Sequence, residues 1–247
     1  MNPLDALRHY FTAQTFLTRV PAPQWVGFSE DWVPPSVAWF PLVGAAVGAC
    51  GAAVFWLLAD QTHPTVAAVA AVLVTVLVTG AIHEDGLADT ADGIGGGRDR
   101  AHSLEIMRDS RVGSYGVVAL VLALCLRIAL LAALGGGAAP VALVLAHSLA
   151  RASVLPLMTT LPYLRDQGVG SPFLASHPPK TLAVFVALTL VIAGLCDGLV
   201  PVLVAAAVSA CAWGYFRHRL GGITGDGFGA VVVVVEVAVL LTVLIQR

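Results

Sequence analysis

The sequence predicts an all-α fold, a polytopic integral membrane helical bundle of about seven transmembrane helices with a cytoplasmic N-terminus. Of the 247 residues, 58% are hydrophobic and 11% are charged, less than half the charged share of a typical soluble domain. Several apolar runs have the length of a bilayer crossing, and basic residues gather in alternate connecting segments. Because no repeat or linker divides the chain, residues 1–247 are expected to form a single catalytic membrane domain.

Residues 1–36 are mixed in polarity and are expected to form a cytoplasmic or interfacial N-terminal segment. Leu4, Leu7 and Phe11 recur at helical spacing, which predicts a short interfacial helix that ends before Pro21. A loosely ordered tail explains the same composition equally well. A signal peptide is not expected, because the N-terminus lacks a basic flank followed by an apolar core and a small-residue cleavage site.

The remaining apolar runs are the candidate spans. They are Val37–Leu58, Thr65–Ile82, Ser114–Leu134, Ala138–Thr160, Thr181–Cys196, Leu199–Phe216 and Phe228–Ile245. Most reach the roughly 17–25 residues that a bilayer core requires, whereas Thr181–Cys196 is short and is followed by a tight turn. The number of spans is therefore predicted only to within about one.

The basic residues test this topology independently. With a cytoplasmic N-terminus, the cytoplasmic segments carry Arg8, Arg19, Arg98, Arg100, Arg108, Arg111, Arg165, Lys180, Arg217 and Arg219. The opposite loops, residues 59–64, 135–137 and 197–198, carry no basic residue. This alternation follows the positive-inside rule. It predicts that the polar segment 83–113, the loop at Arg165 and the loop 221–227 lie on one membrane face.

The segment from His83 to Gly113 is the expected cytoplasmic catalytic segment. It holds seven of the 15 acidic residues and four of the 13 basic residues of this apolar chain. If the segment is helical, the carboxylates of Asp85, Asp89 and Asp92 share one face within an arc of about 60°. Like charges at this spacing repel one another, so a bound cation would stabilise them.

Oxygen ligands without a neighbouring cysteine favour a hard divalent metal, Mg²⁺ or Mn²⁺. Asp85, Asp89 and Asp92 are the candidate ligands, with Glu84 beside them as a further one. The alternative is a solvated, salt-bridged loop between helices. His83 could accept a proton near the metal or could orient an aspartate, and the second use is the commoner one.

Planar, permanently charged guanidinium groups suit phosphate oxygens. The candidate phosphate-binding residues are Arg98, Arg108, Arg111 and Arg165. An oxygen-ligated metal and arginines at a membrane surface together indicate phosphoryl or phosphodiester transfer. Nucleoside triphosphate hydrolysis is not expected, because the sequence contains no P-loop or kinase signature.

Three charged residues, Arg127, Arg151 and Glu236, fall inside candidate spans. Arg151 and Glu236 have similar depths from the cytoplasmic ends of their spans, which predicts that they pair. The pair could be purely structural, or it could line the substrate cavity, and Arg127 has no evident partner. The four cysteines stand alone in apolar runs, so neither a disulfide framework nor a zinc site is indicated. A net charge of −2 gives no reason to expect nucleic acid.

The polar segment closely resembles the cobalamin synthase family, whose members are also called adenosylcobinamide-GDP ribazoletransferases. The similar stretches are HEDGLADTADG at 83–93, GRDR at 97–100 and EIMRDSRVG at 105–113. Further stretches resemble the family elsewhere: FLTRVP at 16–21, FPLVG at 40–44, LPYLR at 161–165, and GGITGD at 221–226 with Glu236. The resemblance therefore extends along the whole chain. One departure is Gly227, where the family usually has threonine.

The resemblance implies that the chain joins adenosylcobinamide-GDP to α-ribazole or its 5′-phosphate, with release of GMP and with Mg²⁺ as cofactor. The 5′-hydroxyl of α-ribazole is the expected nucleophile. The expected location is the bacterial inner membrane, with the active site facing the cytoplasm. The resemblance adds Asp226 as a metal ligand or orienting group. It is compatible with a homo-oligomer or with contacts to other cobalamin-assembly enzymes.

Two other functions are considered. A CDP-alcohol phosphotransferase also places aspartates and glycines at a cytoplasmic helix end, but its pattern requires Ala-Arg after the first Asp-Gly pair, and here Asp89 follows Ala88. A membrane transporter would be compatible with the charges inside the spans. The aspartates at the surface and the lack of an inverted hydropathy repeat argue against it.

Overall fold

A computed structural model describes residues 2–165, 173 and 179–247. The secondary structure of these residues is helical, apart from one isolated parallel bridge between Tyr163 and Ile223. The predicted all-α class is therefore confirmed. The helices are α1 (Pro3–Leu17), α2 (Val33–Ser36), α3 (Phe40–Ala59), α4 (Pro64–Thr79), α5 (Ile82–Gly96), α6 (Arg100–Ile106), α7 (Ser114–Ala152), α8 (Val154–Thr160), α9 (Pro179–Leu195), α10 (Leu199–Arg219) and α11 (Gly225–Ile245).

The chain is a membrane protein, but the expected count of about seven spans is not confirmed by helix length and composition. Within the described residues, four helical stretches are long and apolar enough to cross a bilayer, or five if the bent pair α4 and α5 counts as one. One stretch, Ser114–Thr160, covers two of the predicted runs, and α9 has only 17 residues. All seven predicted runs are nevertheless helical.

Helix α7 folds back on itself at Gly135, whose backbone is not helical (φ 66°, ψ −178°). In a straight helix, Arg127 and Arg151 would lie about 36 Å apart at 1.5 Å per residue. Both side chains instead contact Glu236. The two runs predicted to flank residues 135–137 are thus antiparallel limbs of one kinked helix.

Close packing in the bundle depends on small residues, as in many membrane helices. Any side chain at Gly44 or Gly48 of α3 would collide with the backbone of α7 at His147 or Leu143. These glycines let α3 lie directly against the second limb of α7.

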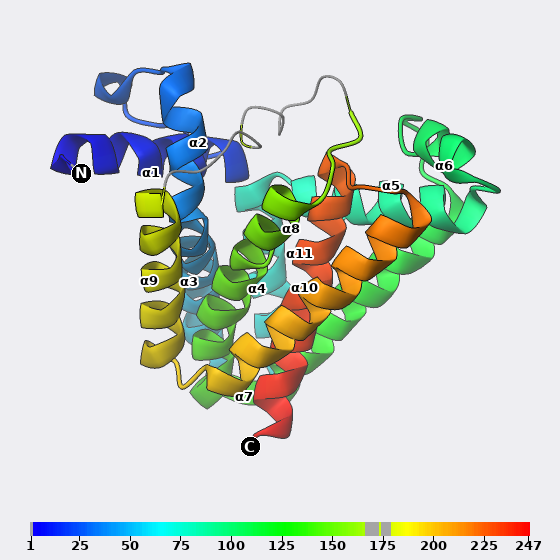
Figure 1. The fold of residues 1–247 in the computed structure, drawn as a ribbon. Helices are drawn as coiled ribbons and strands as arrows, with labels where there is room; N and C mark the ends of the chain where they lie inside the picture. The colour runs from blue at the N-terminus through cyan, green and yellow to red at the C-terminus, as the bar shows by residue number, and fades with distance from the viewer. Residues whose placement is uncertain (1, 166–172, 174–178) are drawn as a thin grey trace.

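Helix α5 leaves the direction of α4 by 89° and therefore runs across the end of the bundle (Figure 1). Two consecutive left-handed residues make this turn, Gly80 (φ 67°) and Ala81 (φ 59°). A positive φ is uncommon for alanine, which makes Ala81 a locally strained position. The strain is offset by backbone hydrogen bonds from Gly80 to Leu77 and from Ala81 to Val76.

The polar segments gather at one end of the molecule. Helices α1, α5 and α6 and the connection between α10 and α11 lie at the end opposite the C-terminus (Figure 1). The bridge between Tyr163 and Ile223 joins the loop near Arg165 to the loop that precedes α11. The predicted meeting of these segments on one face is confirmed, while the side of the membrane stays a prediction.

Candidate active site

Helices α5 and α11 cross in close contact at Gly86 and Gly229. A Cβ atom on Gly86 would lie 2.7 Å from the carbonyl oxygen of Asp226 and 3.2 Å from the Cα atom of Gly229. The crossing therefore sets Asp226, in the first turn of α11, beside the turn of α5 that carries Asp85 and Asp89.

The proximity of these three carboxylates is visible in their electrostatics. Partial burial, followed by the negative charges of Asp226 and Asp85, raises the pKa of Asp89 to about 6. A cation placed among these oxygens would relieve the repulsion. Their all-oxygen chemistry suits Mg²⁺. In the part of the chain that the structure describes, however, no group of three His, Cys, Asp or Glu residues is already arranged to hold a metal ion.

Asp226 is fixed by its neighbours. Arg165 donates a 2.5 Å hydrogen bond to Oδ2 of Asp226, and Thr224 donates one of 3.3 Å to the same oxygen. Arg165 also donates to the carbonyl oxygen of Met107 at the end of α6. Arg165 thus connects three polar segments. Both of these hydrogen bonds to Asp226 are made by Oδ2, which leaves Oδ1 for a ligand as far as the described residues are concerned.

Asp92 has a different environment from Asp85 and Asp89, although it lies on the same face of α5. Its Oδ2 accepts a 2.7 Å hydrogen bond from the backbone N–H of Gly113, and its Oδ1 accepts one of 2.9 Å from Gly116. No side chain of α7 itself caps that helix, so Asp92 supplies the cap from α5. Its predicted place in a metal shell is therefore less well supported than that of Asp85 or Asp89.

Glu84 points into the bundle. Its Oε1 accepts a 2.7 Å hydrogen bond from Arg127 of α7, and Arg127 also lies 2.9 Å from Oε2 of Glu236 on α11. Arg127, which has no partner evident in the sequence, therefore bridges two acids. This contact does not bring Glu84 to the other candidate metal ligands.

The predicted pair of Arg151 and Glu236 is confirmed. Oε1 of Glu236 accepts from Arg151 and lies 2.9 Å from Nδ1 of His147. Arg127, Arg151 and Glu236 are each exposed by less than 5%. With Glu84 they form a buried network whose two positive and two negative charges balance, as burial of charged groups requires.

The ring of His83 lies against the buried network, and among the described residues no hydrogen bond joins it to an aspartate, so the expected orientation of an aspartate stays a prediction. Nη2 of Arg151 lies 3.4 Å from Nδ1 of the buried His83 ring. A guanidinium group can only donate, so Nδ1 accepts and the proton of the neutral ring is on Nε2. In this arrangement, the ring is set to donate a hydrogen bond rather than to accept a proton.

The remaining candidate arginines are exposed on and around α6. Arg111 is paired with Asp109 at 2.5 Å, and this contact lowers the pKa of Asp109 to about 2. Within the described residues, no ion pair is recorded for the side chain of Arg98 or Arg108. These side chains can reach a bound phosphate only through movement, because none of them touches the acids of α5.

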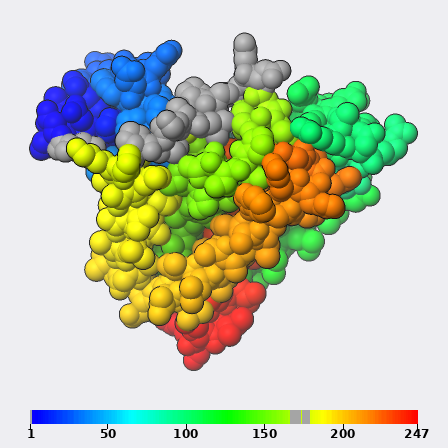
Figure 2. Space-filling model, in the orientation of Figure 1, coloured from blue at the N-terminus to red at the C-terminus, as the bar shows by residue number. Residues whose placement is uncertain are grey.

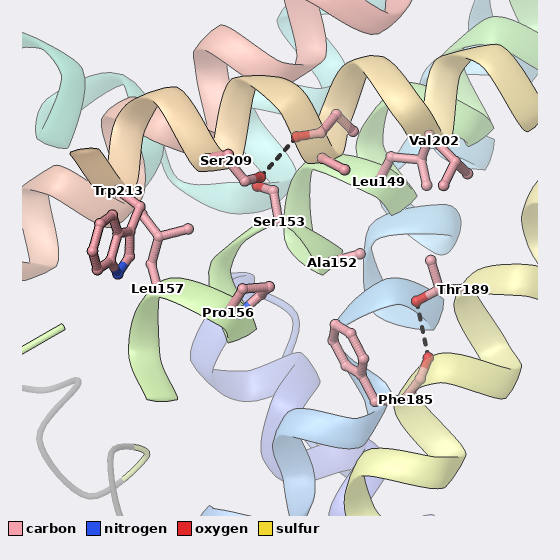
Figure 3. A pocket seen from close by; sticks show the side chains of 13 residues that line it. Leu149, Ala152, Ser153, Pro156, Leu157, Phe185, Thr189, Val202, Ser209 and Trp213 are labelled. Carbon is pink, nitrogen blue, oxygen red and sulfur yellow. Dashed lines mark hydrogen bonds between the residues drawn. The ribbon is translucent and has the colours of Figure 1, made fainter. Parts of the chain in front are cut away.

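A cleft of about 490 Å³ opens beside Asp226 and Arg165. Its lining includes the end of α1 and residues of α3, α8 and α11, and it reaches His83 and Arg151. Sequence reasoning did not predict that the N-terminal segment would form part of this wall. A second pocket, of about 450 Å³, lies between α8, α9 and α10, and the described residues that line it are all uncharged (Figure 3). Figure 2 shows this region as a recess between yellow α9 and gold α10.

Comparison with known protein families covers the residues of this site. The family model described as cobalamin-5-phosphate synthase matches residues 9–244, which include the acids, the buried network and the wall from α1. The chain belongs to the cobalamin-5-phosphate synthase family.

Relatives named adenosylcobinamide-GDP ribazoletransferase support the membership. The protein from Ralstonia nicotianae is 40% identical, over 97% of this chain and 96% of its own length. The protein from Leptothrix cholodnii is 39% identical over 95% and 94%, and that from Shewanella halifaxensis is 40% identical over 91% and 90%. No solved structure matches this member of the cobalamin-5-phosphate synthase family.

The structure also places the departure from the family pattern. A Cβ atom on Gly227 would lie 2.7 Å from Ile223 and 3.2 Å from the ring of Phe216. The threonine that the resemblance leads us to expect here would thus point toward buried apolar groups. The glycine leaves the contacts of Asp226 with Arg165 and Thr224 in place.

Proposed function

We propose that the chain is an adenosylcobinamide-GDP ribazoletransferase, which joins adenosylcobinamide-GDP to α-ribazole or its 5′-phosphate and releases GMP. Relatives with this name match nearly the full chain. The observation that carries the proposal is the crossing of α5 and α11, which brings Asp226 and its partner Arg165 to Asp85 and Asp89. Carboxylates beside an arginine suit the transfer of a phosphoryl group.

Asp85, Asp89 and Asp226 would hold Mg²⁺ on the diphosphate of the donor. When bound, this ion would neutralise charge that develops on the phosphate oxygens. Arg165 fixes Asp226 and can turn toward a phosphate oxygen. Arg98, Arg108 and Arg111 would approach from the α6 region as the donor binds.

In the reaction, a hydroxyl oxygen of α-ribazole forms a bond to the phosphorus on the cobinamide side, and the bond from that phosphorus to the GMP oxygen breaks. The hydroxyl proton passes to a carboxylate of the same cluster, because the hydrogen bond from Arg151 leaves His83 without a free acceptor atom. The family description, cobalamin-5-phosphate synthase, implies a product that keeps its 5′-phosphate. The 5′-hydroxyl is blocked in that reaction, so the expectation that it attacks is corrected to another ribose hydroxyl.

The active site would face the cytoplasm of a bacterial inner membrane. The end of the bundle that carries α1, α5 and α6 also carries most of the arginines, and the opposite loops 59–64, 135–137 and 197–198 carry none.

Asp89→Asn tests the proposed function with purified protein and GMP release as the assay. We expect the wild-type chain to release GMP from adenosylcobinamide-GDP and α-ribazole, and the variant to lose at least about tenfold in kcat/KM at saturating Mg²⁺. Asp60→Asn, at the exposed far end of α3, is the control and should leave the rate unchanged. Turnover of CDP-diacylglycerol by the wild-type chain instead would overturn the proposal in favour of a CDP-alcohol phosphotransferase.

A further inference from the structure

The cleft beside Asp226 has a lining of two kinds. Asp226 and Arg165 contact each other on one part of the wall, and Phe16 of α1 lies on another. The Phe16 ring is half-buried, with buried Phe40 and Phe173 packed against it at centroid distances of 6.0 and 4.0 Å. Further apolar groups of the wall are Leu17, Val154, Met158, Phe228 and Val232. An apolar wall with a few polar groups at one side is typical of a small-molecule site, and about 490 Å³ lies within the usual range for one.

The proposed reaction offers three chemical groups for this cleft: the corrinoid, the guanine of the donor and the base of the acceptor. A corrinoid with its side chains is several times larger than a nucleoside. Guanine presents N–H donors on its pairing edge, and a site that selects it needs acceptors for them. Among the described residues of the lining, Asp226 is the sole carboxylate, and no side-chain amide is present.

The threonine hydroxyl groups of the wall add little polarity, and Tyr163 contributes one phenolic hydroxyl. Thr15 and Thr18 donate to carbonyl groups of their own helix, at Phe11 and Gln14, and Thr79 donates to Thr75. The benzimidazole of α-ribazole is a flat, largely apolar aromatic group. It therefore matches the apolar part of the wall at Phe16 better than guanine does.

Arg19 adds one positive charge to the cleft. Its backbone N–H donates to the carbonyl of Val78, and its side chain packs closely over Gly80, where a Cβ atom would collide with the guanidinium stem. Within the described residues, no salt bridge is recorded for Arg19, and its side chain is exposed. A guanidinium group held at this place without an acidic partner suits a phosphate.

We propose that this cleft is the acceptor subsite: it holds the benzimidazole of α-ribazole against the apolar part of the wall at Phe16, and Arg19 binds the phosphate of α-ribazole 5′-phosphate. The inference rests on the proposed function. It accounts for the participation of α1, a cytoplasmic or interfacial helix, in a wall that also contains Asp226. In this arrangement Asp226 borders both substrates, because the proposed function places the donor diphosphate at Asp85, Asp89 and Asp226.

The test measures KM separately for the donor, for α-ribazole and for α-ribazole 5′-phosphate. Phe16→Ala should raise KM for both acceptors roughly tenfold, with kcat and KM for adenosylcobinamide-GDP close to the wild-type values. Arg19→Ala should raise KM for the 5′-phosphate by a similar factor and leave KM for α-ribazole unchanged. Phe185→Ala is the matched control, because it removes a ring of the same size from the apolar pocket between α8, α9 and α10 (Figure 3).

The outcomes separate the two proposals. If the wild-type chain releases no GMP, the proposed function fails. If it is active but Phe16→Ala raises KM for adenosylcobinamide-GDP, or leaves acceptor KM unchanged, the acceptor subsite is overturned while the function stands. If Phe16→Ala does not fold, Phe16→Leu replaces it, because leucine keeps the apolar bulk without the ring. Arg19→Ala is a further test of the acceptor subsite: equal effects on KM for α-ribazole and for its 5′-phosphate would overturn it.

Discussion

Arg127 illustrates how much of the bundle depends on one buried charge. It donates to Glu84 of α5 and lies 2.9 Å from Glu236 of α11, so one side chain of α7 joins the two helices that carry the site. A buried charge whose partner is removed is costly, because the remaining charge is neither hydrated nor paired.

We therefore expect Arg127→Met to lower the free energy of unfolding by about 3–5 kcal/mol, since it removes a positive charge that neutralises the buried carboxylates of Glu84 and Glu236. Thermal unfolding in detergent measures the change. Arg217→Met, at the exposed end of α10, is the control and should have little effect. Equal unfolding temperatures for Arg127→Met and the wild-type chain would show that the network does not stabilise the fold.

Asp92→Asn should reduce stability rather than metal affinity. The amide nitrogen would face a backbone N–H of Gly113 or Gly116, which leaves two donors opposed and costs about 1–3 kcal/mol. We expect a lower unfolding temperature and an unchanged Mg²⁺ concentration for half-maximal activity. Asp89→Asn should instead leave the unfolding temperature unchanged and raise the Mg²⁺ concentration for half-maximal activity. A raised Mg²⁺ requirement at unchanged stability would instead make Asp92 a ligand.

At the scale of helices, the crossing of α5 and α11 determines whether the acids meet. A Cβ atom on Gly86 would approach backbone atoms of Asp226 at 2.7 and 3.0 Å, and backbone cannot move aside as a flexible side chain can. We expect Gly86→Ala to separate the helices and to lower kcat at least about tenfold, because catalysis by positioning is sensitive to shifts of an ångström.

GMP release measures this effect. Gly214→Ala on α10 is the matched control, since a Cβ atom there meets no other atom within 4 Å. Normal turnover by Gly86→Ala would mean that the close crossing is not required.

The helices themselves could be predicted from apolar length and from the i, i+4, i+7 spacing of aspartates in α5. The partners of those aspartates could not. Helical periodicity places Asp92 on the face of Asp85, but it cannot show that the start of α7 covers that turn. Gly113 and Gly116, spaced so that both N–H groups reach one carboxylate, were the available signal. Arg127 was likewise left without a partner, because pairing across helices requires the fold.

At the scale of the whole molecule, the positive-inside pattern predicts which end faces the cytoplasm. In a background without the four native cysteines, Arg98→Cys should react with an impermeant thiol reagent from the cytoplasmic side of membrane vesicles. Gly136→Cys, next to the fold in α7, should react from the opposite side. Labelling of both positions from the same side would contradict the arrangement.

The convergence of distant loops was the most predictable feature at this scale, since topology alone brings the segments near Asp85, Arg165 and Asp226 to one face. The shape of the cleft was not predictable. It depends on the end of α1 and on Arg19, which packs over the turn at Gly80, and the composition of residues 1–36 is equally compatible with a loose tail.

Helix α5 is held by protein contacts near both of its ends. Gly86 packs against the start of α11, and Asp92 accepts a hydrogen bond from the backbone at the start of α7. Gly86, Asp92 and Gly116 are all buried inside the protein. A membrane of different thickness would tilt the long helices. The distance between Asp85 and Asp226 would stay the same, because it is set by contacts inside the protein. Reconstitution in short-chain or long-chain phospholipids should therefore leave turnover much the same, which makes this synthase tolerant of changes in the host membrane.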